Sequence, residues 1–216
     1  MTKAIIFDMD GVLTDTEAVS ARAWRECGLL QQIRDMEQTI LDCIGLNEND
    51  MRAYFAGKYG EEFAYREFKK NKSRIFEEIL EKEGIPVKPG ARELLEYLRR
   101  EGWEIGLASS TKGYKIRARL EKIGLLSYFG TIVAGDMVTH SKPHPEIYLR
   151  ACEEMGVKPQ ETFAIEDSPN GIRSACAAGM KVLIVPDLIQ PGRELLEMAA
   201  GCFASLDQVR EYLEEK

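Results

Sequence analysis

Short apolar runs alternate with helical patterns along most of this 216-residue chain. The runs lie at 4–8, 103–109, 131–135, 162–167 and 181–186, and four of them are almost continuously apolar, which is typical of strands covered on both faces. Helical patterns follow at 90–101, 112–123, 144–155 and 169–178, and the segment 205–216 has the pattern of a final amphipathic helix. This alternation predicts an α/β fold built on a doubly wound, Rossmann-like parallel sheet.

The first connection is far too long for a loop between a strand and its helix. About 80 residues separate Asp8 from the helix that begins near Gly90, whereas such loops usually take roughly 2–6 residues. This segment has helical spacing and turn residues at both ends. We therefore expect a core domain from 1–14 and 90–216, and an inserted α-helical cap domain at 15–89. The cap aromatics, which we expect to form its core rather than line a pocket, are Tyr54, Phe55, Tyr59, Phe63, Tyr65 and Phe68.

Charge, cysteine usage and hydropathy narrow the range of partners. The chain has 36 acidic against 29 basic residues and no basic block, which argues against a nucleic acid polymer as partner. Its 5 cysteines are scattered without a C-x-x-C pair, which argues against a disulfide framework and against a cysteine zinc site. No apolar stretch has the length of a signal peptide core or a membrane span. We expect a soluble, cytoplasmic monomer with no membrane partner.

Polar side chains follow four of the predicted strands where each strand ends. Each has a structural explanation when taken alone, as a turn former, a helix cap or a solvated lysine. In parallel sheets, however, the carboxyl ends of the strands lie at one edge, where ligands bind. The sequence therefore predicts one site at this edge. Its members are Asp8, Asp10, Ser109, Lys142, Glu166 and Asp167.

Phosphoryl transfer is the chemistry that suits this set of residues. Clustered carboxylates repel one another unless a cation lies between them, and Mg²⁺ prefers such oxygens, with Asp8 and Asp167 as the natural side-chain ligands. Asp8 is also the best placed nucleophile for an aspartyl-phosphate intermediate, and Asp10 can protonate the leaving oxygen and then activate water. Lys142 and Ser109 would hold the phosphoryl oxygens.

Four segments carry a family resemblance: DMDGVLTDT, ASS, SKPHPEIY and IEDSPNG. They resemble the four motifs of the haloacid dehalogenase superfamily, in its β-phosphoglucomutase-like branch with a helical cap, and the resemblance covers nearly the whole chain. It implies that Asp8 is the nucleophile and that Asp10 is the acid/base whose backbone carbonyl also ligates Mg²⁺. It implies that Asp167 is a metal ligand and that Glu166 lies at or behind the metal.

The resemblance also assigns the neighbouring polar residues. It makes Ser109 and Lys142 the phosphate holders. Further residues near the phosphate or the cap are Ser110, Thr111 and Lys112, and the hinge contains Thr14, Asp15 and Thr16.

The resemblance separates some of the reactions known in this superfamily. Dehalogenases lack an aspartate at the position of Asp10, which favours phosphate ester chemistry here. β-Phosphoglucomutases carry a histidine at the position of Ser20 and a cap arginine at the apparent position of Glu48. Lys70 and Lys72 could supply positive charge from the cap, although a solvated helix face also accounts for them. We expect a Mg²⁺-dependent phosphatase for a small phosphorylated metabolite, a sugar phosphate or nucleotide. The alternatives are a hexose phosphomutase and, from a different class, a non-catalytic binding protein.

Overall fold

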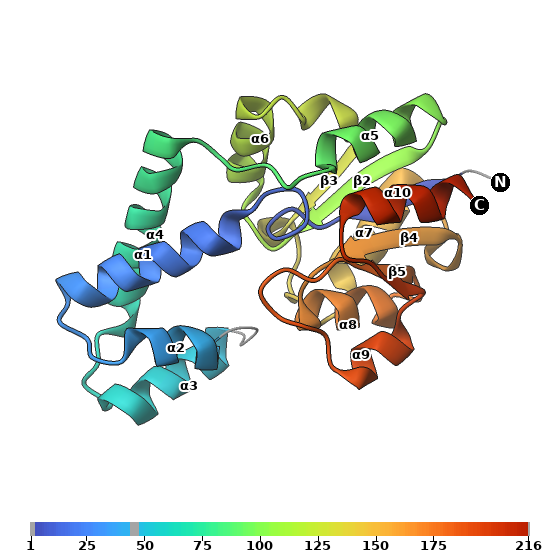
Figure 1. Cartoon of the computed structure of the whole chain (residues 1–216). Helices are drawn as coiled ribbons and strands as arrows, with labels where there is room; N and C mark the ends of the chain where they lie inside the picture. The colour runs from blue at the N-terminus through green and yellow to red at the C-terminus, as the bar shows by residue number, and fades with distance from the viewer. Residues whose placement is uncertain (1–2, 44–47, 216) are drawn as a thin grey trace. The chain divides into compact units, whose positions relative to one another are not determined.

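The computed structural model describes residues 3–43 and 48–215, which form two compact units (Figure 1). The core unit comprises Met1–Asp15 and Pro86–Lys216, and the helical unit comprises Thr16–Ile85. Each unit has its own hydrophobic core.

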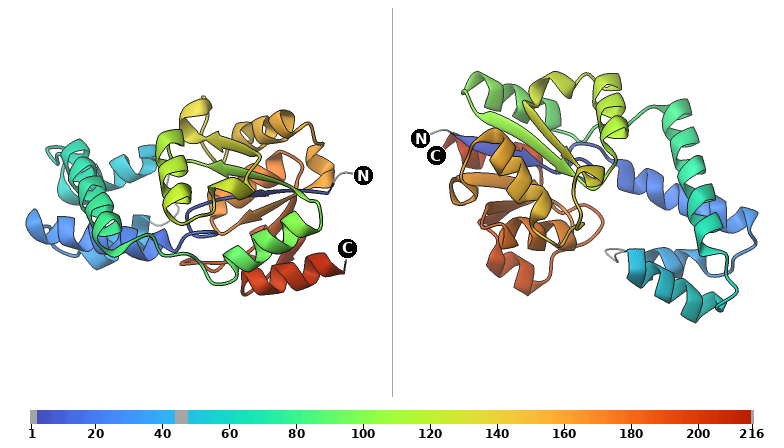
Figure 2. Two further views of the ribbon diagram at one scale, coloured as in Figure 1. Left: turned by 90° about the horizontal axis from the view of Figure 1, so that it is seen from above. Right: turned by 180° about the vertical axis from the view of Figure 1, so that it is seen from behind.

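The core unit is built on a parallel sheet of six strands in the order β3-β2-β1-β4-β5-β6. Figure 2 shows this sheet, with its covering helices, from two further sides. In its centre, Phe7 is paired with Leu107 of β2 on one side and with Ile165 of β4 on the other. The doubly wound α/β prediction is confirmed. Only the last strand was missed, because two residues are too few to give a periodic pattern. The strands are β1 (Ala4–Phe7), β2 (Glu104–Ser109), β3 (Thr131–Ala134), β4 (Thr162–Glu166), β5 (Lys181–Ile184) and β6 (Gly201–Cys202).

Helices cover both faces of this sheet. Ile5 and Phe7 pack into one cluster with α5 (Ala91–Arg100), α6 (Gly113–Lys122) and α10 (Leu206–Glu214). Ile6, between them, packs into the opposite cluster, because successive strand residues point to opposite faces. The helices of that cluster are α7 (Glu146–Met155), α8 (Pro169–Ala177) and α9 (Arg193–Met198). Short 3₁₀ turns complete the unit: η1 (Leu126–Tyr128), η2 (Gly135–Met137) and η3 (Pro159–Glu161).

The helical unit is held together largely by aromatic side chains. Phe55 is fully buried, and its ring centroid lies 5.0–5.2 Å from those of Phe63, Tyr65 and Phe68. The predicted aromatic core of this unit is therefore confirmed. No helix among the described residues has both the length and the apolar character needed to cross a membrane. The helices are α1 (Thr16–Leu30), α2 (Met36–Cys43), α3 (Glu48–Tyr59) and α4 (Tyr65–Glu83).

The two linkers to the helical unit pair with each other inside the core unit. Thr14 forms an antiparallel bridge with Val87, and the amide of Asp15 donates to the carbonyl of Pro86 at 2.9 Å. The amide of Lys88 likewise donates to the carbonyl of Leu13 at 2.9 Å. Because of this pairing, the second boundary of the core unit lies before Pro86, earlier than the predicted start at residue 90.

Candidate active site

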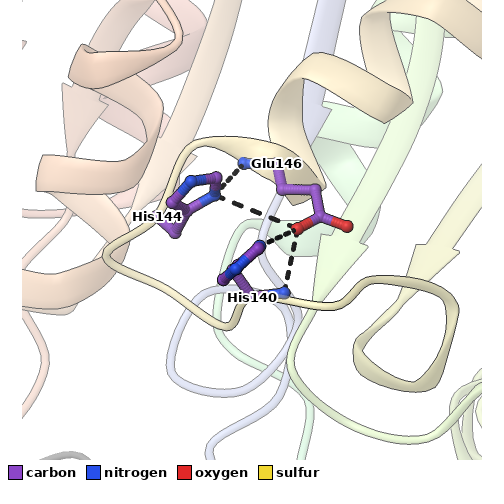
Figure 3. A group of neighbouring side chains, drawn as sticks. All are labelled: His140, His144 and Glu146. Atoms are coloured by element: carbon purple, nitrogen blue, oxygen red, sulfur yellow. Dashed lines mark hydrogen bonds and ion pairs between the residues drawn. The ribbon is translucent and has the colours of Figure 1, made fainter.

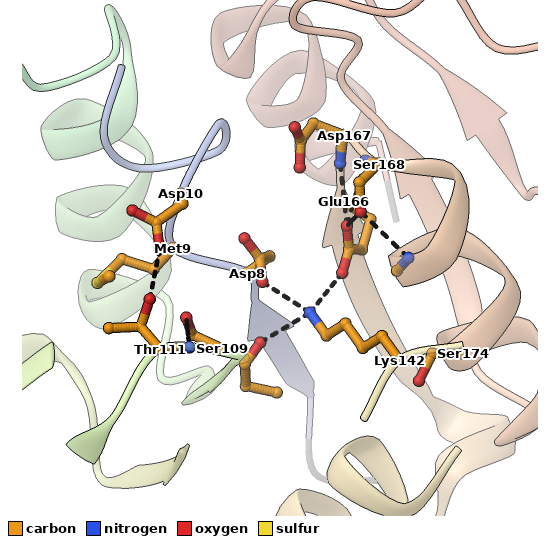
Figure 4. Close-up of polar contacts among 12 residues, drawn as sticks. Asp8, Met9, Asp10, Ser109, Thr111, Lys142, Glu166, Asp167, Ser168 and Ser174 are labelled. Atoms are coloured by element: carbon orange, nitrogen blue, oxygen red, sulfur yellow. Dashed lines mark hydrogen bonds and ion pairs between the residues drawn. The ribbon is translucent and has the colours of Figure 1, made fainter. Parts of the chain in front are cut away.

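Asp8 lies at the centre of a buried charged cluster at the carboxyl edge of the sheet (Figure 4). Its amide donates to the carbonyl of Ile165 at 3.0 Å, which continues the pairing of β1 with β4 and fixes the direction of the side chain. Lys142 Nζ lies 2.6 Å from Asp8 Oδ1 and 2.6 Å from Glu166 Oε1, and it also donates to the carbonyl of Ala108 at 3.0 Å. One ammonium group therefore bridges two buried carboxyl groups.

Glu166 is wholly buried, and both of its oxygens accept hydrogen bonds from the protein. Oε1 accepts from Lys142 and, at 2.7 Å, from the hydroxyl of Tyr148. Oε2 accepts from the amides of Asp167 and Ser168 at 3.2 and 3.4 Å, and from Ser168 Oγ at 3.2 Å. This arrangement suits a residue that holds Lys142 in place, behind any metal ion rather than on it.

Burial and charge act in opposite directions in this cluster. Burial raises the pKa of Asp8 to about 8, because this effect exceeds the lowering caused by Lys142, and Glu166 raises the pKa further. For Lys142, burial lowers the pKa, but Asp8 and Glu166 together outweigh it, so the pKa lies above its usual value. Lys142 therefore remains charged. A second positive charge beside Asp8 would be needed to stabilise its ionised form as well.

Asp10 is held by residues that follow β2. Thr111 Oγ1 donates to Asp10 Oδ2 at 2.9 Å, and Arg119 Nη1 lies 3.6 Å from Asp10 Oδ1. The amide of Thr111 also donates to the buried hydroxyl of Ser109 at 3.2 Å. Ser110 is exposed in the same loop, and its expected role near the phosphate remains a prediction.

Asp167 reaches the loop after β1 because residue 11 is glycine. Gly11 has φ +89°, and a Cβ on it would lie only 2.2 Å from Asp167 Oδ2. The missing side chain therefore lets the end of β4 approach the end of β1. Asp8, Asp10 and Asp167 all lie at this edge of the sheet (Figure 4), and their carboxylate and carbonyl oxygens are the kind of hard donors that Mg²⁺ prefers. The raised pKa of Asp8 is consistent with this fit, since a cation would stabilise its charged form.

Two further predicted site residues, Thr16 and Lys70, belong to the helical unit. Thr16 is buried at the start of α1, and Lys70 is exposed on α4. Lys72 Nζ lies 5.5 Å from the centre of the Trp24 ring. The side chain of Glu48 lies outside the described residues. The expected roles of Thr16 and Lys70 at a hinge or over a substrate remain predictions.

Two site residues were not singled out from the sequence. Tyr148 lies in the motif that contains Lys142, next to the buried Ile147 on α7, and such a position is typical of a core tyrosine. Arg119 follows the buried Ile116 by one helical turn, so a charged residue on the apolar face of α6 was the available signal.

Comparisons with known proteins agree with this site. Residues 5–185 match the family described as haloacid dehalogenase-like hydrolase. A phosphorylated carbohydrates phosphatase from Thermotoga maritima is 32% identical over 99% of both chains. Hexitol phosphatase B from Escherichia coli is 30% identical, covering 85% of this chain and 83% of that protein. The crystal structure of β-phosphoglucomutase from Clostridium difficile has a TM-score of 0.78 at 26% identity and covers 100% of this chain and 96% of that one.

The sheet and the cluster at its edge, taken with these relatives, define an enzyme of the phosphatase class. The chain belongs to the haloacid dehalogenase-like hydrolase family, in its β-phosphoglucomutase-like branch.

Removal of the Tyr148 hydroxyl tests how much its hydrogen bond to Glu166 stabilises the protein. Tyr148→Phe is expected to lower the free energy of unfolding by about 1–3 kcal/mol, because a buried carboxylate loses a donor. Denaturant unfolding at neutral pH measures this loss. Tyr114→Phe is the matched control, since Tyr114 is 66% exposed and its hydroxyl loss should leave stability unchanged. Equal effects in both variants would contradict the assigned contact.

Proposed function

We propose that this chain is a Mg²⁺-dependent phosphatase that hydrolyses small phosphorylated carbohydrates through an aspartyl-phosphate intermediate. The observation that carries the proposal is the cluster in which Lys142 Nζ lies 2.6 Å from Asp8, with Asp10 two residues further along the same loop. The cluster combines a buried carboxylate, a fixed cation and a second carboxylate, which are the groups that phosphoryl transfer needs.

The proposed reaction has two steps that use the same residues. Asp8 attacks phosphorus, so that an oxygen–phosphorus bond forms to its carboxylate while the ester bond breaks, and Asp10 protonates the leaving oxygen. Asp10 then takes a proton from water, which attacks phosphorus and releases phosphate from Asp8. Lys142 and Ser109 hold the phosphoryl oxygens. Mg²⁺, held by Asp8, Asp167 and the carbonyl of Asp10, would supply neutralising charge.

The names of two relatives support carbohydrate phosphates as the substrate class. One relative is a phosphatase of phosphorylated carbohydrates and the other is a hexitol phosphatase. The test is phosphate release from a panel of hexose, pentose and hexitol phosphates, with nucleoside monophosphates as the competing class. Faster turnover of the nucleotides would refute the carbohydrate assignment while leaving the phosphatase class intact.

A phosphomutase is the second candidate, because a β-phosphoglucomutase shares the fold of this chain. The resemblance described above implies a histidine at the position of Ser20 and a cap arginine at the apparent position of Glu48 in such mutases, and this chain has neither, which favours hydrolysis. With β-glucose 1-phosphate and catalytic glucose 1,6-bisphosphate, we therefore expect phosphate release to exceed formation of glucose 6-phosphate. A coupled assay for glucose 6-phosphate beside a phosphate assay measures both products. Efficient glucose 6-phosphate formation with little phosphate release would establish the mutase instead.

Mg²⁺ binding is expected to release a proton from Asp8. The pKa of about 8 means that most Asp8 carboxyls hold a proton at pH 7, and a cation placed beside the carboxylate favours its charged form. Release per Mg²⁺ should therefore be larger at pH 7 than at pH 9, where more of the carboxyl is already charged. Calorimetry in buffers of different ionisation enthalpy measures this number. Asp8→Asn should abolish the release, and an unchanged proton count in that variant would place the proton elsewhere.

A further inference from the structure

A second group of metal-binding side chains lies outside the catalytic cluster. His140 and His144 lie on the loop before α7, and Glu146 is the first residue of that helix (Figure 3). His140 Nδ1 lies 2.8 Å from Glu146 Oε2, and His144 Nδ1 lies 4.0 Å from the same oxygen. One ligand atom from each of the three residues lies within 4.8 Å of the others. Two ring nitrogens and one carboxylate oxygen therefore lie within the span of a single metal site.

The backbone beneath these side chains is fixed on both sides. Glu146 accepts hydrogen bonds from the amides of Thr139 and His140 at 2.7 and 2.9 Å. The hydroxyl of Ser174, which is fully buried on α8, donates to the carbonyl of His144 at 2.7 Å. The loop therefore presents its ligand atoms from set positions, so that little ordering remains to be done when an ion binds.

An ion at this position would replace hydrogen bonds that the ligand atoms now make. His140 Nδ1 lies 2.8 Å from Glu146 Oε2, and an ion that binds both atoms would take the place of the hydrogen bond between them. His144 Nδ1 accepts a hydrogen bond from the amide of Glu146 at 3.3 Å, so an ion bound to that nitrogen would replace this bond. The side chains of His140 and His144 are 61% and 51% exposed, which leaves the site open to an ion and to water ligands.

Imidazole nitrogens select the kind of ion. Two histidines with one carboxylate suit Zn²⁺ and similar transition ions, whereas Mg²⁺ takes oxygen ligands. Zn²⁺ bonds of about 2.0–2.1 Å place neighbouring tetrahedral ligands roughly 3.3 Å apart, and the spacings of 2.8 and 4.0 Å lie on either side of that value.

We propose that His140, His144 and Glu146 bind a divalent transition ion of the Zn²⁺ type at a site separate from the catalytic Mg²⁺ site. Lys142 lies midway between the two histidines in sequence. A bound ion would therefore join the two sides of the loop that carries the catalytic lysine, and would stabilise that loop without entering the reaction.

Calorimetric titration of the whole chain with Zn²⁺, in excess Mg²⁺ to occupy the oxygen site, tests the proposal. The wild type is expected to bind one Zn²⁺, and His144→Ala or His140→Ala to weaken this binding by about 10- to 100-fold. These are the only 2 histidines of the chain, so imidazole binding reports on this site alone. Cys202→Ser is the matched control, because Cys202 is an exposed thiol that could also bind Zn²⁺, and its loss should leave binding unchanged.

Thermal unfolding provides the second readout. Zn²⁺ should raise the unfolding temperature of the wild type and of Cys202→Ser, but not of His144→Ala, because a ligand stabilises only the state that binds it. The readout is the shift that Zn²⁺ produces within each variant, because His144→Ala also loses the hydrogen bond from the amide of Glu146 and can start from a lower unfolding temperature. Equal Zn²⁺ affinity in wild type and both histidine variants, or no binding by the wild type, would overturn the proposal and leave a hydrogen-bonded loop.

Discussion

Asp8→Asn is expected to lower kcat by at least about 1,000-fold, because the variant loses the attacking oxygen of the reaction. The fold should survive, since asparagine keeps the shape of the side chain and its Oδ1 can still accept from Lys142, now at 2.6 Å from Asp8. Phosphate release at saturating sugar phosphate measures the loss, and circular dichroism checks the fold.

Asp136→Asn is the matched control for this variant. Asp136 also follows a strand at the same edge, but it is exposed, and asparagine can still accept from the amide of Gly113. Wild-type kcat is expected in the control. If Asp8→Asn also retained more than a few per cent of the wild-type rate, another group would have to be the nucleophile.

Lys142→Met is expected to lower kcat by about 100- to 1,000-fold, because the phosphoryl oxygens lose a fixed positive charge. Methionine keeps the length of the buried stem but removes the ammonium group. Lys142 lowers the pKa of Asp8, so its removal should raise that pKa further above about 8 and move the acid limb of the pH–rate profile to higher pH. Lys158→Met, at an exposed lysine that precedes β4, should change neither the rate nor the profile.

The same variant is expected to become less stable as the pH rises. In the wild type, the folded-state pKa of Asp8, about 8, lies above its ordinary value of 3.8. Between these two pH values the folded chain therefore holds a proton that the unfolded chain has lost. This contribution to stability is complete below about pH 4 and is lost as the pH rises through about 8. Without Lys142, two buried carboxylates would then face each other. The unfolding temperature of Lys142→Met should therefore fall more between pH 6 and pH 9 than that of the wild type. An equal fall in both proteins would argue against the stabilisation of charged Asp8 by Lys142.

Much of the site could be predicted from the order of strands and polar residues. Asp8, Ser109 and Glu166 each lie at or directly after the end of a strand, and the parallel pairing of β1 with β2 and β4 brings these ends together. The rule works because every strand of a parallel sheet ends at the same edge. Lys142 joins them from the loop after β3 because its long side chain reaches the carboxyl groups.

Residues that act through others could not be predicted in this way. Tyr148 and Arg119 lie on helices whose apolar periodicity accounts for buried positions but not for the polar atoms to which they point. The hydrogen-bond partners of Glu166 could not be predicted either, because three of its five hydrogen bonds come from the turn that follows β4. Such contacts depend on the direction of individual side chains, which a sequence pattern does not record.

The paired linkers have a consequence for how this architecture can vary. The chain leaves the core unit after Asp15 and re-enters it at Pro86, and the two points are joined by a hydrogen bond of 2.9 Å. Exit and re-entry points this close can be bridged by almost any compact segment, or by a short turn, without altering a strand of the sheet. The helical unit could thus be exchanged for another insertion while the sheet, Asp8 and Lys142 stay where they are.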